Sequence, residues 1–244
     1  MAARVDALPW DTDFFGLSIG RVDLDGLDAD DLAEVEAEAR DLGIECLYGS
    51  LDPADAEATV LVQRRGFRFV EAATTFSLRP DEPPIPRPEG VTVRIGGLDD
   101  LPDLKAASDG LAPWSRYAVD PRFGLDAARR LQWAWLERAA GGDGGRRQLV
   151  LAEVDGEPVA FITRCTTPAP IVDCVWRRSL RAPGAARYLI EDARHWAGAQ
   201  RLLGGPIAAR NVQALKYVSH CGYRVSKVRY LYHRWLDEDA RASL

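Results

Sequence analysis

Hydrophobic residues recur along the first third of the chain at two spacings. From 29 to 42 the apolar positions lie three or four residues apart, which predicts a helix. Residues 45–50 and 67–78 predict strands, and a second helix is expected over 56–65 with Gly66 as its C-terminal stop. The first part of the chain therefore predicts a short α/β arrangement.

The same two spacings continue beyond residue 90. Helical periodicity predicts helices at 98–108, 125–140 and 184–197, and Asn211 is expected to cap a last helix. Asp155-Gly156 predicts a tight hairpin, because both turn positions need positive φ. Strands are expected at 91–95, 148–154, 158–165, 171–176, 202–208 and 223–235. The pattern predicts an α/β (α+β) fold in which helices flank a mixed central sheet.

A proline-rich segment separates the two parts. Residues 80–90 contain five prolines, which favour extended, semi-rigid backbone. We expect an N-terminal domain at 1–79, a linker at 80–90 and a second domain at 91–244.

The two parts share a weak internal repeat. Residues 55–78 and 211–233 both read as a polar cap, an amphipathic helix, a glycine-aromatic pair and a long strand. Tyr217 in the second copy corresponds to Leu61 in the first. We interpret the first copy as a shortened one without the residue needed for chemistry. The alternative is chance, since helix-glycine-strand plans are common.

Charge and cysteine usage exclude several classes of protein. The net charge of −6 argues against a nucleic-acid-binding protein and gives no general attraction to anionic membranes. No apolar run approaches the length of a membrane helix, and the N-terminus lacks a signal-peptide core. Neither the histidines nor the cysteines have metal-ligand spacing. We expect a cytoplasmic protein with no metal and with reduced thiols at Cys46, Cys165, Cys174 and Cys221.

Two motifs in the second part resemble those of the GNAT superfamily of N-acetyltransferases. Arg181-Ala-Pro-Gly184-Ala185-Ala186 is similar to the family's Arg/Gln-x-x-Gly-x-Gly/Ala pyrophosphate loop. Asn211-Val-Gln-Ala-Leu-Lys-Tyr217-Val-Ser-His-Cys-Gly-Tyr is similar to the family segment that carries an asparagine, a tyrosine and a glycine-aromatic pair. The resemblance implies a GNAT fold, with a truncated GNAT-like N-terminal part, and acetyl-CoA as acyl donor.

The resemblance assigns roles on the donor side. Arg181, Gly184, Ala185 and Ala186 would hold the pyrophosphate, where a helix N-terminus favours anions. Pro183 departs from a full set of donors because it has no N–H. Asn211 caps its helix and would contact the CoA arm. A backbone amide within 173–175, and thus at Cys174 or Val175, would bind the thioester oxygen.

Tyr217 is the candidate general acid. A phenol of pKa ~10 can donate a proton to a thiolate whose conjugate acid lies near ~8.5. The attacking amine also needs a base, for which Asp173, Asp120 or an ordered water are candidates. The base stays unassigned.

Two shorter stretches resemble the dTDP-fucosamine (dTDP-4-amino-4,6-dideoxygalactose) acetyltransferase group. They are Leu8–Gly16 and Ser115–Phe123, and they imply a nucleotide-linked amino sugar as acceptor. Arginines and aromatics interleave in a segment that does not read as regular structure, which favours ligand contact. The substrate-binding candidates are Trp114, Arg116, Tyr117, Asp120 and Arg122, with Arg164, Arg177 and Arg178 as further arginines for a diphosphate.

Two other functions stay open. The chain could acetylate another small amine or a peptide, or it could be a non-catalytic GNAT-fold protein that binds CoA or assembles with others. The edge of the final strand could also pair across a homodimer interface.

Overall fold

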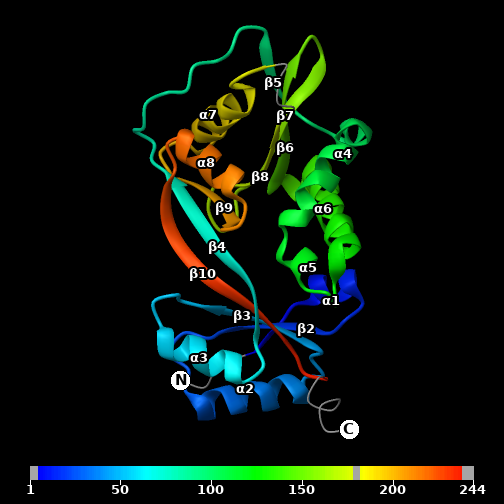
Figure 1. Cartoon of the computed structure of the whole chain (residues 1–244). Helices are drawn as coiled ribbons and strands as arrows, with labels where there is room; N and C mark the ends of the chain where they lie inside the picture. Colours follow the sequence, from blue (N-terminus) through cyan, green and yellow to red (C-terminus); the bar gives the residue numbers. More distant parts are fainter. Residues whose placement is uncertain (1–4, 178–181, 238–244) are drawn as a thin grey trace. The chain divides into compact units, whose positions relative to one another are not determined.

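The structure is a computed structural model that describes residues 5–177 and 182–237. The chain forms two compact units (Figure 1). Unit 1 holds the residues up to Ala73 and those from Val228 onward, and unit 2 holds Thr74–Lys227. The two boundaries fall inside long strands.

Unit 1 is a small sheet with helices. Its elements are β1 (Asp6–Ala7), α1 (Pro9–Phe15), β2 (Ile19–Asp23), α2 (Ala29–Asp41), β3 (Cys46–Leu51), α3 (Ala56–Arg64), the first part of β4 (Arg68–Leu78) and the end of β10 (Arg224–Trp235). Strand β3 pairs in parallel with β2 and antiparallel with β10. The apolar face of α2 is buried at Leu32, Val35 and Ala39, as its periodicity predicts.

Unit 2 contains a larger sheet in the order β4-β9-β8-β7-β6-β5, where β5 to β8 are antiparallel neighbours and β8 runs parallel to β9. Helices α4 and α6 cover one face of this sheet and α7 covers the other (Figure 1). The strands are β5 (Val91–Ile95), β6 (Arg147–Val154), β7 (Glu157–Cys165), β8 (Ile171–Arg177) and β9 (Leu202–Ala208). The helices are α4 (Leu101–Leu111), α5 (Arg116–Val119), α6 (Gly124–Ala140), α7 (Ala185–Ala197) and α8 (Val212–His220), with 3₁₀ turns η1 (Leu98–Asp100), η2 (Ala112–Trp114) and η3 (Asp143–Gly145).

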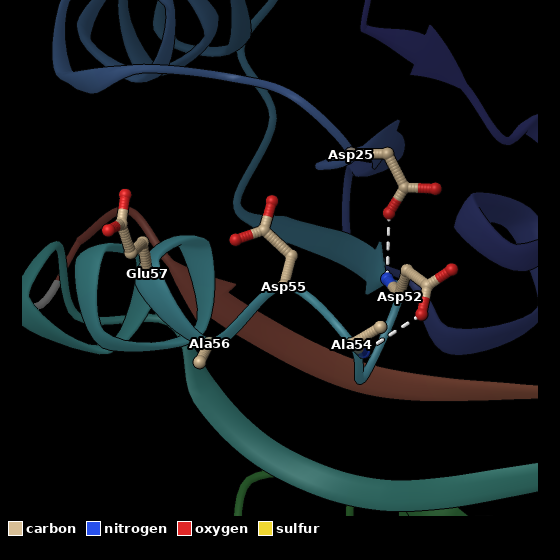
Figure 2. Close-up of a pocket in the computed structure, with 6 residues that line it drawn as sticks. All are labelled: Asp25, Asp52, Ala54, Asp55, Ala56 and Glu57. Atoms are coloured by element: carbon tan, nitrogen blue, oxygen red, sulfur yellow. Dashed lines mark hydrogen bonds between the residues drawn. The ribbon is translucent and has the colours of Figure 1, made fainter.

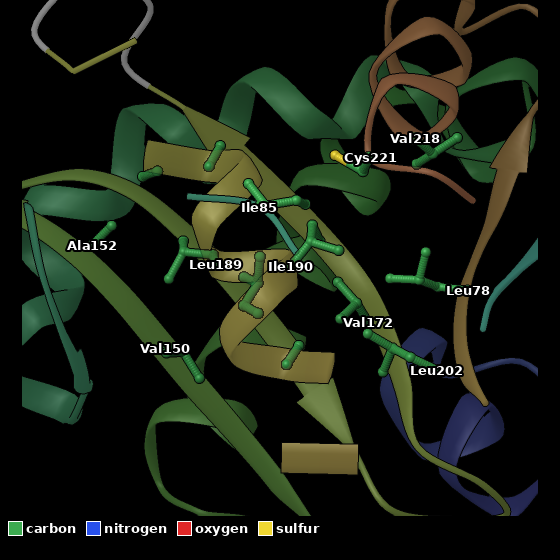
Figure 3. Close-up of a cluster of buried hydrophobic side chains, with 14 of the residues drawn as sticks. Leu78, Ile85, Val150, Ala152, Val172, Leu189, Ile190, Leu202, Val218 and Cys221 are labelled. Carbon is green, nitrogen blue, oxygen red and sulfur yellow. The ribbon is translucent and has the colours of Figure 1, made fainter. Parts of the chain in front are cut away.

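One of the two buried clusters of unit 2 lies between the sheet and helices α7 and α8. Figure 3 shows Leu189 and Ile190 of α7 packed among strand residues such as Val150 and Val172. Val218 and Cys221 join the same cluster from the end of α8. The periodicity of 184–197 therefore predicted the correct buried face of α7.

Local turn chemistry follows the sequence, with two corrections. Asp155 and Gly156 have φ of 53° and 78°, which confirms the hairpin between β6 and β7. The single helix predicted at 98–108 is instead the 3₁₀ turn η1 followed by α4, with a proline in the first turn of α4. The sequence also missed the short helices α1 and α5.

The proline-rich segment packs along α7. Ile85 is buried, and its amide donates to Glu191 Oε2 at 3.1 Å. Arg194 donates from Nη1 to the carbonyl oxygen of Pro80 at 3.1 Å. These residues of the segment therefore contribute to the packing of unit 2. The division into 1–79, 80–90 and 91–244 stays a prediction.

The two copies of the repeat have the same local geometry. Asp55 Oδ1 accepts from the amide of Ala58 at 2.8 Å, and Asn211 Oδ1 accepts from the amide of Ala214 at 3.1 Å. Each helix ends at a glycine of positive φ, 80° at Gly66 and 86° at Gly222. Strand β4 begins in unit 1 and ends in unit 2, whereas β10 begins in unit 2 and ends in unit 1. Each copy thus contributes its strand to both units.

Candidate functional site in unit 2

The parallel strands β8 and β9 part soon after they meet. Within the part of the chain that the structure describes, they pair only at Ile171↔Leu203 and Val172↔Gly204. Beyond that level β8 continues to Arg177 and β9 to Ala208. We call these stretches, 173–177 and 205–208, the open β8–β9 edges. Their facing backbone groups are not joined by a ladder.

Both strands depart from regular geometry directly after the last pair. On β8, the pairing with β7 shifts so that Thr163 faces Cys174 while Arg164 faces Val172, which makes Asp173 the extra residue of a bulge. On β9, the next residues are Gly205 and Pro206, and a proline has no N–H to give to a ladder. The separation therefore has a cause on each strand.

The corresponding strands of unit 1 stay together. There β2 and β3 pair in parallel from Ile19↔Cys46 through Asp23↔Ser50 without interruption. The helix between them, α2, starts at Asp28, whose carboxylate accepts from the amides of Asp30 and Asp31. These hydrogen bonds lower the pKa of Asp28, so the helix N-terminus carries its own anion. Among the described residues of unit 1, β2 and β3 therefore stay paired, and the helix that connects them has a capped start.

Helix α7, which follows β8, begins differently. Gly184 stands at its N-cap position with φ of 92°, and none of the described side chains caps it. The first turn holds Ala185 and Ala186, and no acidic residue lies in it. Its first N–H groups have no intrahelical acceptor, although the amide of Ala185 donates to the carbonyl oxygen of Ala182, just before the helix, at 3.1 Å. This start can accept an anion, as the resemblance implies for Gly184, Ala185 and Ala186. The predicted Arg181 lies outside the described residues.

Tyr217 lies on α8 beside this helix start. Its phenolic oxygen donates to the carbonyl oxygen of Ala186 at 2.7 Å, and the side chain is half-buried. Asn211 caps α8 through the amide of Ala214, as predicted. The structure therefore brings Tyr217 into contact with the first turn of α7, although the two belong to different motifs of the sequence.

A second tyrosine, which the sequence did not single out, lies close to the level where the strands part. A Cβ at Gly204 would come within 2.9 Å of Tyr223 Cε1, so the ring covers the glycine. The Tyr223 hydroxyl is buried and has no hydrogen-bond partner among the described residues. Burial raises the pKa of this phenol, which keeps it protonated. A buried unpaired hydroxyl is a cost that a bound polar group would relieve.

Asp173 is held by two neighbours on the sheet. Its carboxylate accepts from Thr163 Oγ1 of β7 and pairs with Arg147 of β6. Both of its carboxylate oxygens already accept hydrogen bonds, so the geometry does not favour Asp173 as the base. Asp120, the other candidate, is buried and accepts from the amide of Arg122 at 2.9 Å.

The predicted acceptor segment is more regular and more buried than expected. Residues 112–119 form η2 and α5. Tyr117 is buried, with Arg116 at 2.9 Å from its hydroxyl and Phe123 packed edge-on. Among the predicted residues Trp114 is exposed and Arg116 and Arg122 are half-buried. Tyr117 and Asp120 therefore support the segment rather than offer a free surface.

Arg210 connects this segment to the start of α8. Its Nη2 donates to the carbonyl oxygens of Pro113 and Ser115 at 3.2 and 3.0 Å. The contact fixes η2 and α5 next to the turn that precedes Asn211. The predicted acceptor segment and the helix of Tyr217 therefore meet at this turn.

Arg164, Arg177 and Arg178 were the other arginines expected to bind a diphosphate, and the structure describes the side chain of Arg164. Arg164 is buried, donates to Gln148 and Asp192 at 2.9 Å, and lies over the Trp196 ring. This corrects its interpretation as a diphosphate ligand. Arg178 lies outside the described residues, and the side chain of Arg177 is not described.

Two thiols, of half-buried Cys174 and buried Cys221, lie near the site but do not suit nucleophilic chemistry. Burial raises the pKa of Cys174, and it raises that of Cys221 to about 11. The thiolate, which is the reactive form, is therefore scarce at neutral pH. Cys174 nevertheless stands directly after the bulge residue.

An acidic hollow lies in unit 1. Figure 2 shows it lined by Asp25, Asp52, Asp55 and Glu57, with alanines between them. Asp55 caps α3, while Asp52 and Asp25 accept from backbone amides. These three carboxylates serve the local turns.

No group of three or more metal-ligating side chains is present among residues 5–177 and 182–237. In the same ranges no helix is long and apolar enough to cross a membrane.

Comparison with known proteins relates the chain to others through structure. No family model and no curated protein matches the sequence. A functionally unknown conserved protein from Staphylococcus epidermidis superposes with a TM-score of 0.69 at 13% identity, over 96% of this chain and 91% of that one. A GCN5-related N-acetyltransferase from Sphaerobacter thermophilus gives 0.60 at 18% identity, over 96% and 77%.

A tandem GNAT protein from the clavulanic acid biosynthesis pathway is similar over 91% of this chain and 76% of that one, with a TM-score of 0.52 at 14% identity. At these identities the likeness establishes the fold. The chain has a mixed α/β GNAT fold, as its motifs implied. The resemblance to the dTDP-fucosamine group stays a prediction.

Proposed function

We propose that the chain is an acyl-CoA-dependent N-acyltransferase, with acetyl as the acyl group, and that unit 2 alone binds the donor. The open β8–β9 edges next to an uncapped α7 carry this proposal. The N-acetyltransferases with the same fold support it.

The described residues fit such a donor. Its pantetheine arm carries amide groups that could complete the hydrogen bonding of the open β8–β9 edges, and Tyr223 offers a buried hydroxyl nearby. Its pyrophosphate would lie at Gly184, Ala185 and Ala186. When bound, the donor supplies an activated thioester carbonyl.

Two arginines that the motifs do not include would assist at the phosphates. Arg187 belongs to the first turn of α7 and is exposed. Arg87 comes from the proline-rich segment and lies over the Tyr188 ring, 5.9 Å from its centroid. These two arginines place positive charge around the start of α7, although the net charge of the whole chain is −6. They would also offset the donor that Pro183 cannot provide.

Tyr217 is the proposed general acid. In direct transfer the amine nitrogen bonds to the acyl carbon, the carbon–sulfur bond breaks, the sulfur takes a proton and the amine loses one. Tyr217 would turn its hydroxyl from Ala186 to the leaving sulfur. The raised pKa values of Cys174 and Cys221 favour this route over an acyl-enzyme.

The proposed acceptor is the amino group of a nucleotide-linked sugar. The stretch 115–123 carries the resemblance for it, and Trp114 offers an exposed ring at its edge. Another small amine or a peptide is the alternative acceptor.

The test is turnover with acetyl-CoA, followed by release of free thiol, against a panel of amines that includes a dTDP-amino sugar, spermidine and a peptide N-terminus. The proposal expects turnover with at least one amine and the highest kcat/KM for the dTDP-amino sugar. Turnover only with another amine would refute the acceptor but keep the chemistry. Absence of turnover with every amine, when acetyl-CoA binds, would favour the second candidate.

That candidate is a non-catalytic GNAT-fold protein that binds CoA. The observation that favours it is the Tyr217–Ala186 hydrogen bond, because a phenol that only joins two helices needs no chemistry.

A further inference from the structure

Arg147, Asp173 and Thr163 form a clamp across three adjacent strands. Thr163 Oγ1 donates to Asp173 Oδ1, and Arg147 Nη1 donates to Asp173 Oδ2. About a fifth of the Arg147 and Asp173 side chains is exposed, 23% and 21%. Asp173 is the residue at which β8 bulges. The clamp therefore holds β8 at its irregular point.

The clamp lies on the face of the sheet that α4 and α6 cover. Leu149 and Phe161 pack in the core on that face. Arg147 and Thr163 are two positions away from them on β6 and β7, so they point to the same side. Cys174 packs against the same core. Asp173 and Cys174, although adjacent, thus share one face, as the extra residue of a bulge allows.

A bulge decides which way the following amides point. In a regular strand, successive N–H groups alternate between the two neighbours. One extra residue resets this alternation, so the bulge at Asp173 sets which amide of 174–175 faces β9. Beyond the pair Val172↔Gly204, strand β9 no longer pairs with β8, so this amide has no partner on β9 in the ladder. Such an amide is a preorganised donor for an oxygen placed there.

We infer that Arg147, Asp173 and Thr163 are positioning residues that aim a backbone amide of 174–175 at the thioester carbonyl of the donor. The inference rests on the proposed function and goes beyond it, because it assigns the geometry of the carbonyl-binding amide to three side chains that never touch the donor.

The experiment compares two donors that differ at the carbonyl. Acetyl-CoA has a thioester carbonyl, and S-ethyl-CoA has a methylene group in place of that carbonyl. Calorimetry measures both affinities for the full chain and for Thr163→Val, which keeps the side-chain shape and removes the hydroxyl. Thr163→Ser restores the hydroxyl, and Thr92→Val, on an exposed position of β5, is the matched control.

The expected result is that the wild type binds acetyl-CoA more tightly than S-ethyl-CoA by roughly tenfold, the value of one well-placed hydrogen bond. Thr163→Val should lose most of this preference while its affinity for S-ethyl-CoA is unchanged. Its kcat should fall by about 10² with little change in donor KM, as when an oxyanion donor is lost. Thr163→Ser and Thr92→Val should behave as the wild type.

Three results would overturn the inference. The first is that the wild type binds acetyl-CoA and S-ethyl-CoA with equal affinity. The second is that Thr163→Val keeps the preference for acetyl-CoA. The third is that Thr163→Val binds both ligands more weakly by the same factor. The last would mean a merely structural role. If the wild type binds neither ligand, the proposed function itself fails, and the inference fails with it.

Discussion

Replacing Tyr217 by phenylalanine separates a catalytic phenol from a structural one. The change removes a single oxygen and the 2.7 Å hydrogen bond to the carbonyl oxygen of Ala186. The ring stays in its half-buried position on α8. Two effects are therefore expected, one on stability and one on rate, and they differ greatly in size.

The stability effect is small. One neutral hydrogen bond contributes about 0.5–1.5 kcal/mol, and a half-buried one belongs at the lower end. For a chain of this length that corresponds to a fall in Tm of roughly 1–4 °C. Removal of a general acid lowers the rate by about 10²–10⁴, or roughly 3–5 kcal/mol in the activation free energy. Affinity for acetyl-CoA should hardly change.

The assay is single-turnover release of thiol at saturating acetyl-CoA, with calorimetry of donor binding on the same sample. Tyr230→Phe, which removes a phenol oxygen in unit 1, is the matched control and should keep the wild-type rate. Wild-type turnover by Tyr217→Phe would refute the acid role and leave the phenol as a link between α7 and α8.

Three further outcomes are expected. Gly184→Val forces a β-branched residue into φ of 92°, with a strain of about 1–3 kcal/mol, and brings a Cβ to 3.4 Å from Pro88. Calorimetry should therefore show weaker binding of acetyl-CoA to this variant. Wild-type affinity would contradict the start of α7 as the phosphate site. Asn211→Ala should lower the free energy of unfolding by about 1 kcal/mol because the helix cap is lost, whereas Asn211→Asp should keep it. Thermal unfolding measures both variants, and equal Tm values for the two would contradict the cap. Because the pKa of Cys221 is raised to about 11, alkylation of this thiol should be slow at pH 8 and should accelerate as the pH rises toward 11. Mass spectrometry measures the labelling. Fast labelling at pH 8 would contradict the burial of Cys221.

The sequence predicted features that depend on neighbours along the chain. The periodicity of α2 and α7, the Asp155-Gly156 turn and the cap at Asn211 each arise within a few residues, so the pattern contained the information. Helices α1 and α5 are too short for a periodic signal and were missed.

The features that the sequence could not show join distant strands. The separation of β8 from β9 depends on Asp173 and Pro206, which lie on strands that become neighbours only in the fold. The contact of Tyr223 with Gly204 crosses elements in the same way. Neither residue type carries a pattern that would reveal such a partner. The stretch Gly184-Ala185-Ala186 could be singled out because its residues are consecutive, and its role at a pyrophosphate stays a prediction.

Donor binding by unit 2 is tested most directly by a calorimetric titration of the full chain with acetyl-CoA. Unit 2 has the open β8–β9 edges and an uncapped α7, whereas unit 1 has a continuous β2–β3 ladder and the acidic cap of α2. We predict saturable binding with one molecule of acetyl-CoA per chain. Two sites per chain, or no binding, would contradict it.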